Sequence, residues 1–176
     1  MELFLIILRN VAIALVALYL IFVVIDVIFV VSFSSILSHH DHDLFLILTN
    51  KKDYLDNVVS LLNKHSVKLD KKKVEELENF DLKLFEHQDG EEAKKARDLL
   101  TSISDYLMFT ARDNQKVSNN PDFTLLSTYV DELEKVYRHH VVLYNADVLG
   151  YNFWISFAPT RYIYLILKRK PKDIIS

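Results

Sequence analysis

The sequence predicts an all-α protein, with an N-terminal transmembrane helix that continues into an antiparallel four-helix bundle of long helices. Three observations predict this fold class: one unbroken apolar stretch near the N-terminus, apolar residues spaced three and four apart after it, and few turn-forming residues. The 176 residues include 2 Gly, 3 Pro and no Cys. So little glycine disfavours phosphate-binding glycine loops, and the lack of cysteine excludes disulfides and thiolate zinc sites. The formal net charge of −3 gives no reason to expect a nucleic-acid partner.

The N-terminal anchor is expected within residues 1–37. Residues 11–33 form a run of 23 residues interrupted only by Asp26 and Ser32. A helix of that length reaches about 35 Å, enough to cross the hydrocarbon core of a bilayer. A buried core helix and a cleaved signal peptide are the alternatives. A carboxylate inside a bilayer is costly, so Asp26 is expected either near the interface with water or against a partner helix.

Four amphipathic helices are expected within residues 38–157. The first covers 38–69 and is read as a possible continuation of the anchor, with Lys51 and His65 filling two positions of its apolar stripe. The second runs from Lys71 to Gln88, the third from Glu91 to about Lys116, and the fourth from Pro121 or Asp122 to about Phe157. The stripes are Leu44, Leu48, Leu55, Val58, Leu62, Leu69; Val74, Leu77, Phe80, Leu84; Ala93, Ala96, Leu100, Ile103, Leu107, Ala111; and Leu126, Val130 (or Tyr129), Leu133, Val136, Tyr137, His140, Tyr144.

Residues 158–176 form an aromatic and basic tail. In an antiparallel bundle the fourth helix returns toward the membrane, so its end and the tail are expected at the bilayer surface, where aromatic and basic residues are favoured. A solvated end with the aromatic residues in the core is the alternative. The candidate surface residues are Trp154, Arg161, Lys168, Arg169, Lys170 and Lys172.

Two stretches carry a distinctive pattern. Downstream, Asn120, Phe123, Leu126 and Glu134 precede two Tyr-Asn pairs seven residues apart, Tyr144-Asn145 and Tyr151-Asn152, and then Phe157-Ala158-Pro159. Upstream, the pattern is carried by Lys51, Lys52, Asp53, Leu55, Asn57 and Val58. Over residues 37–160 the chain resembles the LemA family. It departs from that family at Asp56, which replaces a proline, and at His140 or Val142, where the family usually has arginine.

The resemblance implies a membrane-anchored helical bundle with roles in envelope maintenance and, in specialised relatives, in magnetosome membrane formation. It implies no catalysis. From the residues alone, the Tyr rings are expected in the core and the Asn amides bonded to helices or connecting loops; a groove for an extended partner is the alternative. Lys51, Lys52 and Asp53 are expected to satisfy buried charges such as Glu134, or else to bind an anionic ligand.

One cluster has metal-ligand chemistry, and it consists of His39, His40, Asp41, His42 and Asp43. His39, His42 and Asp43 would share a helix face at spacings of three and four, which suits a divalent ion. A polar stretch next to the membrane, without metal, is the simpler interpretation. His140 falls on the stripe of the fourth helix and is expected to be a core histidine.

The sequence therefore predicts a non-catalytic, single-pass membrane protein that needs no cofactor. Its expected role is a scaffold or interaction module that binds a protein partner, or a second copy, through the bundle or the Asp26 face. The alternatives are a module that shapes or senses the bilayer surface and an accessory factor of a membrane protease. The basic tail favours a cytoplasmic bundle, and the resemblance to the LemA family implies a short external N-terminus.

Overall fold

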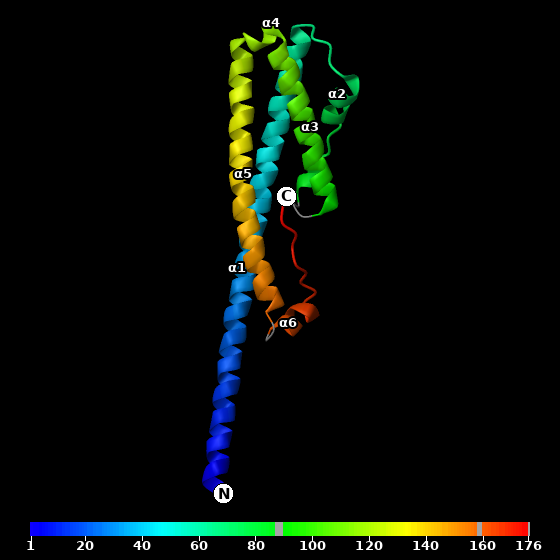
Figure 1. Cartoon of the computed structure of the whole chain (residues 1–176). Coiled ribbons are helices and arrows are strands. Elements are labelled where there is room, and N and C mark those ends of the chain that lie inside the picture. Colours follow the sequence, from blue (N-terminus) through cyan, green and yellow to red (C-terminus); the bar gives the residue numbers. More distant parts are fainter. Residues whose placement is uncertain (87–89, 158–159, 176) are drawn as a thin grey trace. The chain divides into compact units, whose positions relative to one another are not determined.

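The computed structural model describes residues 1–86, 90–157 and 160–175, and within these ranges all regular structure is helical (Figure 1). This confirms the predicted all-helical class. The elements are α1 (Glu2–Lys64), α2 (Lys71–Glu78), the 3-10 helix η1 (Leu82–Phe85), α3 (Glu91–Asp113), α4 (Gln115–Ser118), α5 (Pro121–Ser156) and α6 (Arg161–Ile166).

Helix α1 joins the predicted anchor and the first predicted amphipathic helix into one element of 63 residues. No Gly or Pro interrupts it, so nothing in the backbone forces a break. It ends where Ser66 takes a left-handed φ of 56°. That turn lets the Val67 amide donate a hydrogen bond back to the Leu62 carbonyl, which satisfies one of the free groups at the helix end.

The chain divides into two compact units. The first unit holds Met1–Leu37 and Ala146–Lys172, and the second holds Ser38–Asn145 and Asp173–Ser176. The first boundary falls where the sequence predicted the end of the anchor. The end of α5 and the following residues up to Lys172 group with the N-terminal segment.

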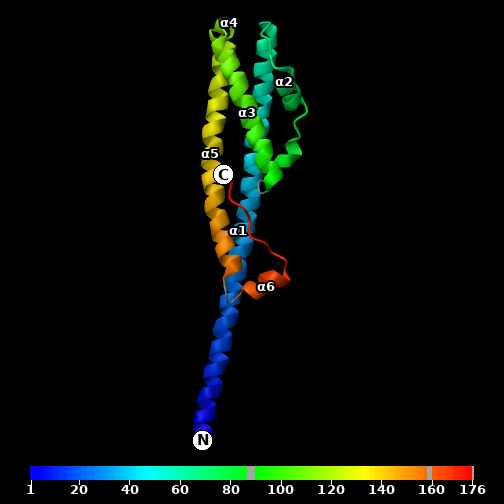
Figure 2. The same ribbon diagram turned by 45° about the vertical axis from the view of Figure 1, so that its right-hand side comes forward.

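In the second unit, the later part of α1 lies beside α3 and beside the first part of α5 (Figure 1, Figure 2). Contacts between α1 and α5 run from Lys51–Glu134 to Tyr54–Tyr129, and the residues next to the helix ends, His65 and Asn120, also meet, so residue numbers on α5 fall as those on α1 rise. The predicted stripe of α3 is buried throughout. Its core positions are Ala93, Ala96, Leu100, Ile103, Leu107 and Ala111.

The second predicted helix is shorter than expected. It was predicted from Lys71 to Gln88, but α2 ends at Glu78 and a separate turn, η1, follows. Asn79 ends α2, because its backbone N–H and its side-chain amide both donate hydrogen bonds to the Glu75 carbonyl. Asp81 then caps η1 by accepting a hydrogen bond from the Lys83 amide. Gln88 lies outside the described residues.

The third and fourth predicted helices agree closely with the structure. Asn114 ends α3 two residues before the predicted Lys116 and caps the short α4. Helix α5 begins at Pro121, as predicted, and Asn120 caps it by accepting a hydrogen bond from the Asp122 amide. Val136 is a correction, because it is exposed rather than part of the core stripe.

In the first unit, the end of α5 and α6 pack against α1. Gly150 allows α5 to approach closely, because a Cβ there would lie 2.6 Å from the ring of Phe33. Phe29 stacks on Trp154, with ring centroids 4.7 Å apart. After α6 the chain continues without further helix among the described residues, up to 175.

Candidate functional site

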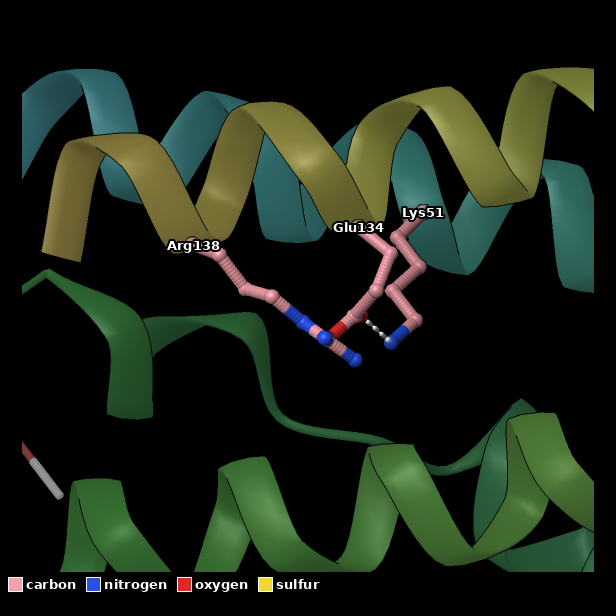
Figure 3. A network of polar contacts seen from close by, with 3 residues as sticks. All are labelled: Lys51, Glu134 and Arg138. Atoms are coloured by element: carbon pink, nitrogen blue, oxygen red, sulfur yellow. Dashed lines mark hydrogen bonds and ion pairs between the residues drawn. The ribbon is translucent and has the colours of Figure 1, made fainter.

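A polar group in the second unit is centred on Glu134 of α5 (Figure 3). Lys51 Nζ on α1 donates to Glu134 Oε2 at 2.8 Å, and Arg138 Nε donates to Glu134 Oε1 at 3.1 Å. The Lys51 side chain is 6% exposed, whereas that of Arg138 is 77% exposed. The structure thus confirms the expected pairing of Lys51 with Glu134 across 83 positions of sequence.

The electrostatics of Glu134 follow from these contacts. Burial tends to raise the pKa of its carboxyl group, but the hydrogen bond and charge of Lys51, with those of Arg138, outweigh it and lower the pKa below its ordinary value of 4.5. The amino group of Lys51 is bonded to a carboxylate of its own chain, so this arrangement favours a structural ion pair over a site for an external anion.

The two neighbours of Lys51 do not join this group. Lys52 Nζ instead bonds Asp56 Oδ2 at 2.7 Å, one turn along the same helix. Asp53 is exposed. The expected pairing with a carboxylate such as Glu134 therefore holds for Lys51, whereas the partner of Lys52 is Asp56, which is 42% exposed, and Asp53 is itself exposed.

Asp26 is enclosed by its own chain. Its side chain is fully buried and accepts a hydrogen bond from Tyr164 Oη at 2.6 Å, in the same unit. Its other oxygen, Oδ1, has no hydrogen-bond partner among the described residues. Asp26 is thus covered by α6 of its own chain rather than exposed to a partner helix, and its position near the bilayer interface stays a prediction.

In the two Tyr-Asn pairs, the tyrosines are buried and the asparagines form hydrogen bonds, as expected. Tyr144 and Tyr151 are buried. Each Asn amide makes two hydrogen bonds to one backbone position of the C-terminal segment. Asn145 pairs with the amide and carbonyl of Ile175 at 2.8 Å each, and Asn152 pairs with those of Lys172 at 2.9 and 2.8 Å. The extended segment that the Asn side chains hold is thus the chain's own C-terminal end.

The candidate membrane-surface residues are mostly solvent-accessible. Arg161, Lys168, Arg169 and Lys170 are exposed, while Lys172 and Trp154 are half-buried. Tyr162, Leu165 and Ile166 of α6 are exposed beside them. An exposed apolar group followed by basic residues is the composition that favours a bilayer surface. Ala158 and Pro159 of the predicted terminal motif lie outside the described residues.

The structure does not bring the predicted metal-ligand residues His39, His42 and Asp43 together as one group. His39 Nε2 lies 3.7 Å from Asp43 Oδ2, but His42 is exposed. Asp43 instead gathers with His40 and with His140 of α5, as the one such group found among the described residues. His140 is half-buried on the α5 stripe, and its Nδ1 makes no hydrogen bond there.

Sequence reasoning did not assign three residues the roles that they have in the structure. Tyr164 lies 138 positions from Asp26, and no spacing rule connects them. His40 and Arg138 gain their roles from the packing of α1 against α5. For Arg138, its position one turn after Glu134 was an available signal.

Comparisons with protein-family models, curated proteins and solved structures find no match for this chain.

Proposed function

We propose that this protein is a single-pass membrane-anchored scaffold or interaction module without catalytic activity. One observation carries the proposal: the N-terminal part of α1 is long and apolar enough to cross a bilayer, and only 11% of its most apolar stretch is buried. Every residue from 1 to 21 is exposed. A core helix of a soluble protein would bury most of such a surface, so a bilayer is the environment that fits it.

The second unit supplies the interaction module. Its contacts between α1 and α5 support the antiparallel helical bundle that we propose. Helix α5 also presents exposed apolar residues spaced four, seven and seven apart, which fall on one helix face. We refer to Leu125, Tyr129, Val136 and Leu143 as the outer stripe. It is a more accessible surface for a helical partner than Asp26, which α6 covers.

The LemA resemblance belongs to the same proposal. It rests on the residues quoted for it, and it implies the same combination of one anchor and a helical bundle. The bonds of Asn145 and Asn152 to the C-terminal segment give the two Tyr-Asn pairs a definite structural purpose in this chain. We further propose a cytoplasmic bundle and a short external N-terminus, since the basic residues follow α6 in the unit that contains the anchor.

The anchor is tested by placing charge on it. Leu15 and Leu18 are 62% and 63% exposed, so Leu15→Arg with Leu18→Arg is harmless to packing in water. In a bilayer each arginine costs about 2.5–3.5 kcal/mol near the helix centre. We expect the double variant to be released from membranes by alkaline carbonate, whereas the wild type stays bound. Protease treatment of a C-terminal tag on right-side-out vesicles of the wild type should leave the tag intact.

The matched control is Phe109→Arg with Val142→Arg. These residues are 72% and 66% exposed and lie outside the apolar stretch, so this variant should remain in the membrane. Retention of the Leu15, Leu18 variant in carbonate would show that the stretch does not span the bilayer. Digestion of the tag would reverse the proposed orientation.

The scaffold role is tested by photo-cross-linking of the full chain in its native membranes. A photoreactive residue at Val136, within the outer stripe, should give one discrete adduct, either with another membrane protein or with a second copy. Lys135 is exposed but lies outside the stripe, so the same residue placed there is the control. Without an adduct at Val136, or with equal adducts at both positions, the outer stripe would not be the partner surface.

A bilayer-surface module is a second candidate function. The observation that favours it is the exposed apolar residues of α6 followed directly by Lys168, Arg169 and Lys170.

A further inference from the structure

Three side chains from α1 and α5 meet in the second unit, at a place that the proposed function does not use. One ligand atom from each of His40, Asp43 and His140 lies within 4.8 Å of the other two. Asp43 Oδ2 is 3.9 Å from His140 Nδ1, and the ring centroids of His40 and His140 are 6.3 Å apart. All three residues are half-buried, so they are partly shielded from water yet accessible to a small ion.

The chemistry of these groups suits a transition metal. Two imidazole nitrogens and one carboxylate oxygen are ligands that zinc and its neighbours accept, whereas calcium and magnesium prefer oxygen atoms alone. Around tetrahedral zinc, with bonds of about 2.0–2.2 Å, ligand atoms lie about 3.3 Å apart. The present separations, up to 4.8 Å, are wider than this, so the side chains would turn toward the ion as it binds.

A second observation points to a ligand at this place. His140 Nδ1 is buried and makes no hydrogen bond among the described residues. The 3.9 Å to Asp43 is beyond hydrogen-bond length. A metal ion between the two groups would satisfy both the ring nitrogen and the carboxylate.

We propose that His40, Asp43 and His140 bind one divalent transition-metal ion of the zinc type. The site differs from the set suggested by helical spacing alone, with which it shares only Asp43. His40 and Asp43 come from α1, and His140 comes from α5, about a hundred positions later in the sequence. The ion would therefore tie α1 to α5 and stabilise the folded second unit, because binding to the folded chain alone favours folding.

The test uses the full chain in detergent micelles, titrated with Zn²⁺ by calorimetry. His40→Gln and His140→Gln keep a polar side chain but remove the ring nitrogens. His42→Gln is the control, since His42 is exposed in the same stretch. We expect one site in the wild type and in the control. In the two other variants the affinity should fall by more than the roughly 10–100-fold typical of losing a supporting contact.

Thermal unfolding gives a second measurement, which is independent of calorimetry. Zn²⁺ should raise the unfolding temperature of the wild type, and a chelator should reverse the rise. In His140→Gln the rise should be absent; if that variant fails to fold, Asp43→Asn replaces it.

Three results would overturn the proposal. The first is a wild type that neither binds Zn²⁺ nor gains thermal stability from it. The second is unchanged binding in His140→Gln. The third is loss of the site in His42→Gln with retention in His140→Gln, which would place the metal on α1 alone. The chain has seven histidines, so stoichiometry without the variants would not decide.

Discussion

At the scale of single residues, Lys51 occupies a core position of α1 that its neighbours on the stripe fill with leucine and valine. Its charge is tolerated there because the long side chain reaches Glu134, which lies nearer the surface and also contacts the exposed Arg138. Loss of Lys51 would leave Glu134 with Arg138 as the only partner shown for it.

We expect Lys51→Met to lower the free energy of unfolding by about 1.5–3 kcal/mol, the usual range for a hydrogen bond to a charged group. Urea unfolding at neutral pH measures this. Lys52→Met is the neighbouring control. The partner of Lys52, Asp56, is 42% exposed and one helical turn away, so that pair is worth only about 0.3–0.5 kcal/mol. Equal losses in both variants would show that burial of the Lys51 pair has no energetic consequence.

The Lys51–Glu134 pair also predicts how acid changes the difference in unfolding free energy between the wild type and Lys51→Met. Because the pKa of Glu134 is lowered in the folded chain, the unfolded chain takes up its proton first as the pH falls. The contribution of the pair is therefore fully present above the ordinary pKa of 4.5 and is lost below it. The stability difference between the wild type and Lys51→Met should shrink below pH 4.5; a constant difference would rule out this linkage.

At the scale of elements, apolar spacing predicted the long helices well. The α3 stripe is buried at all six predicted positions, and α5 ends within one residue of the predicted Phe157. Local hydrogen bonds account for the error after Lys71. The apolar spacing continues through Leu77, Phe80 and Leu84, but Asn79 and Asp81 bond the backbone and divide the segment.

The sequence could predict a residue of the candidate site only where a polar side chain interrupts the apolar stripe of one helix. Lys51 and His140 both interrupt an apolar stripe, so a buried role could be inferred for each. Which residue faces them depends on how two helices pack, and spacing along one helix does not contain that information. For this reason the sequence placed Asp43 with His42, whereas the structure places it with His40 and His140.

At the scale of the whole molecule, charge is unevenly distributed along the chain. Residues 158–176 contain five basic residues and one acidic residue, a net charge of +4; the total is −3, so the rest carries −7. The first unit combines the apolar part of α1 with most of this basic segment. Both features favour an anionic bilayer surface, which is the basis of the second candidate function.

The single tryptophan makes this candidate testable without a label. Trp154 stacks on Phe29 in the first unit, so its fluorescence reports on that unit alone. With the full chain in anionic vesicles, we expect lipids brominated near the headgroup to quench Trp154 more strongly than lipids brominated near the chain end. Replacing Lys168, Arg169 and Lys170 by Gln should weaken the quenching, because the attraction to the anionic surface falls by about 1 kcal/mol per basic residue. The same replacement at Lys71, Lys72 and Lys73 removes equal charge from the second unit and should leave quenching unchanged. If bromine at neither depth affects Trp154, the end of α5 lies away from the bilayer, and the basic segment is a solvated end rather than a lipid-binding surface.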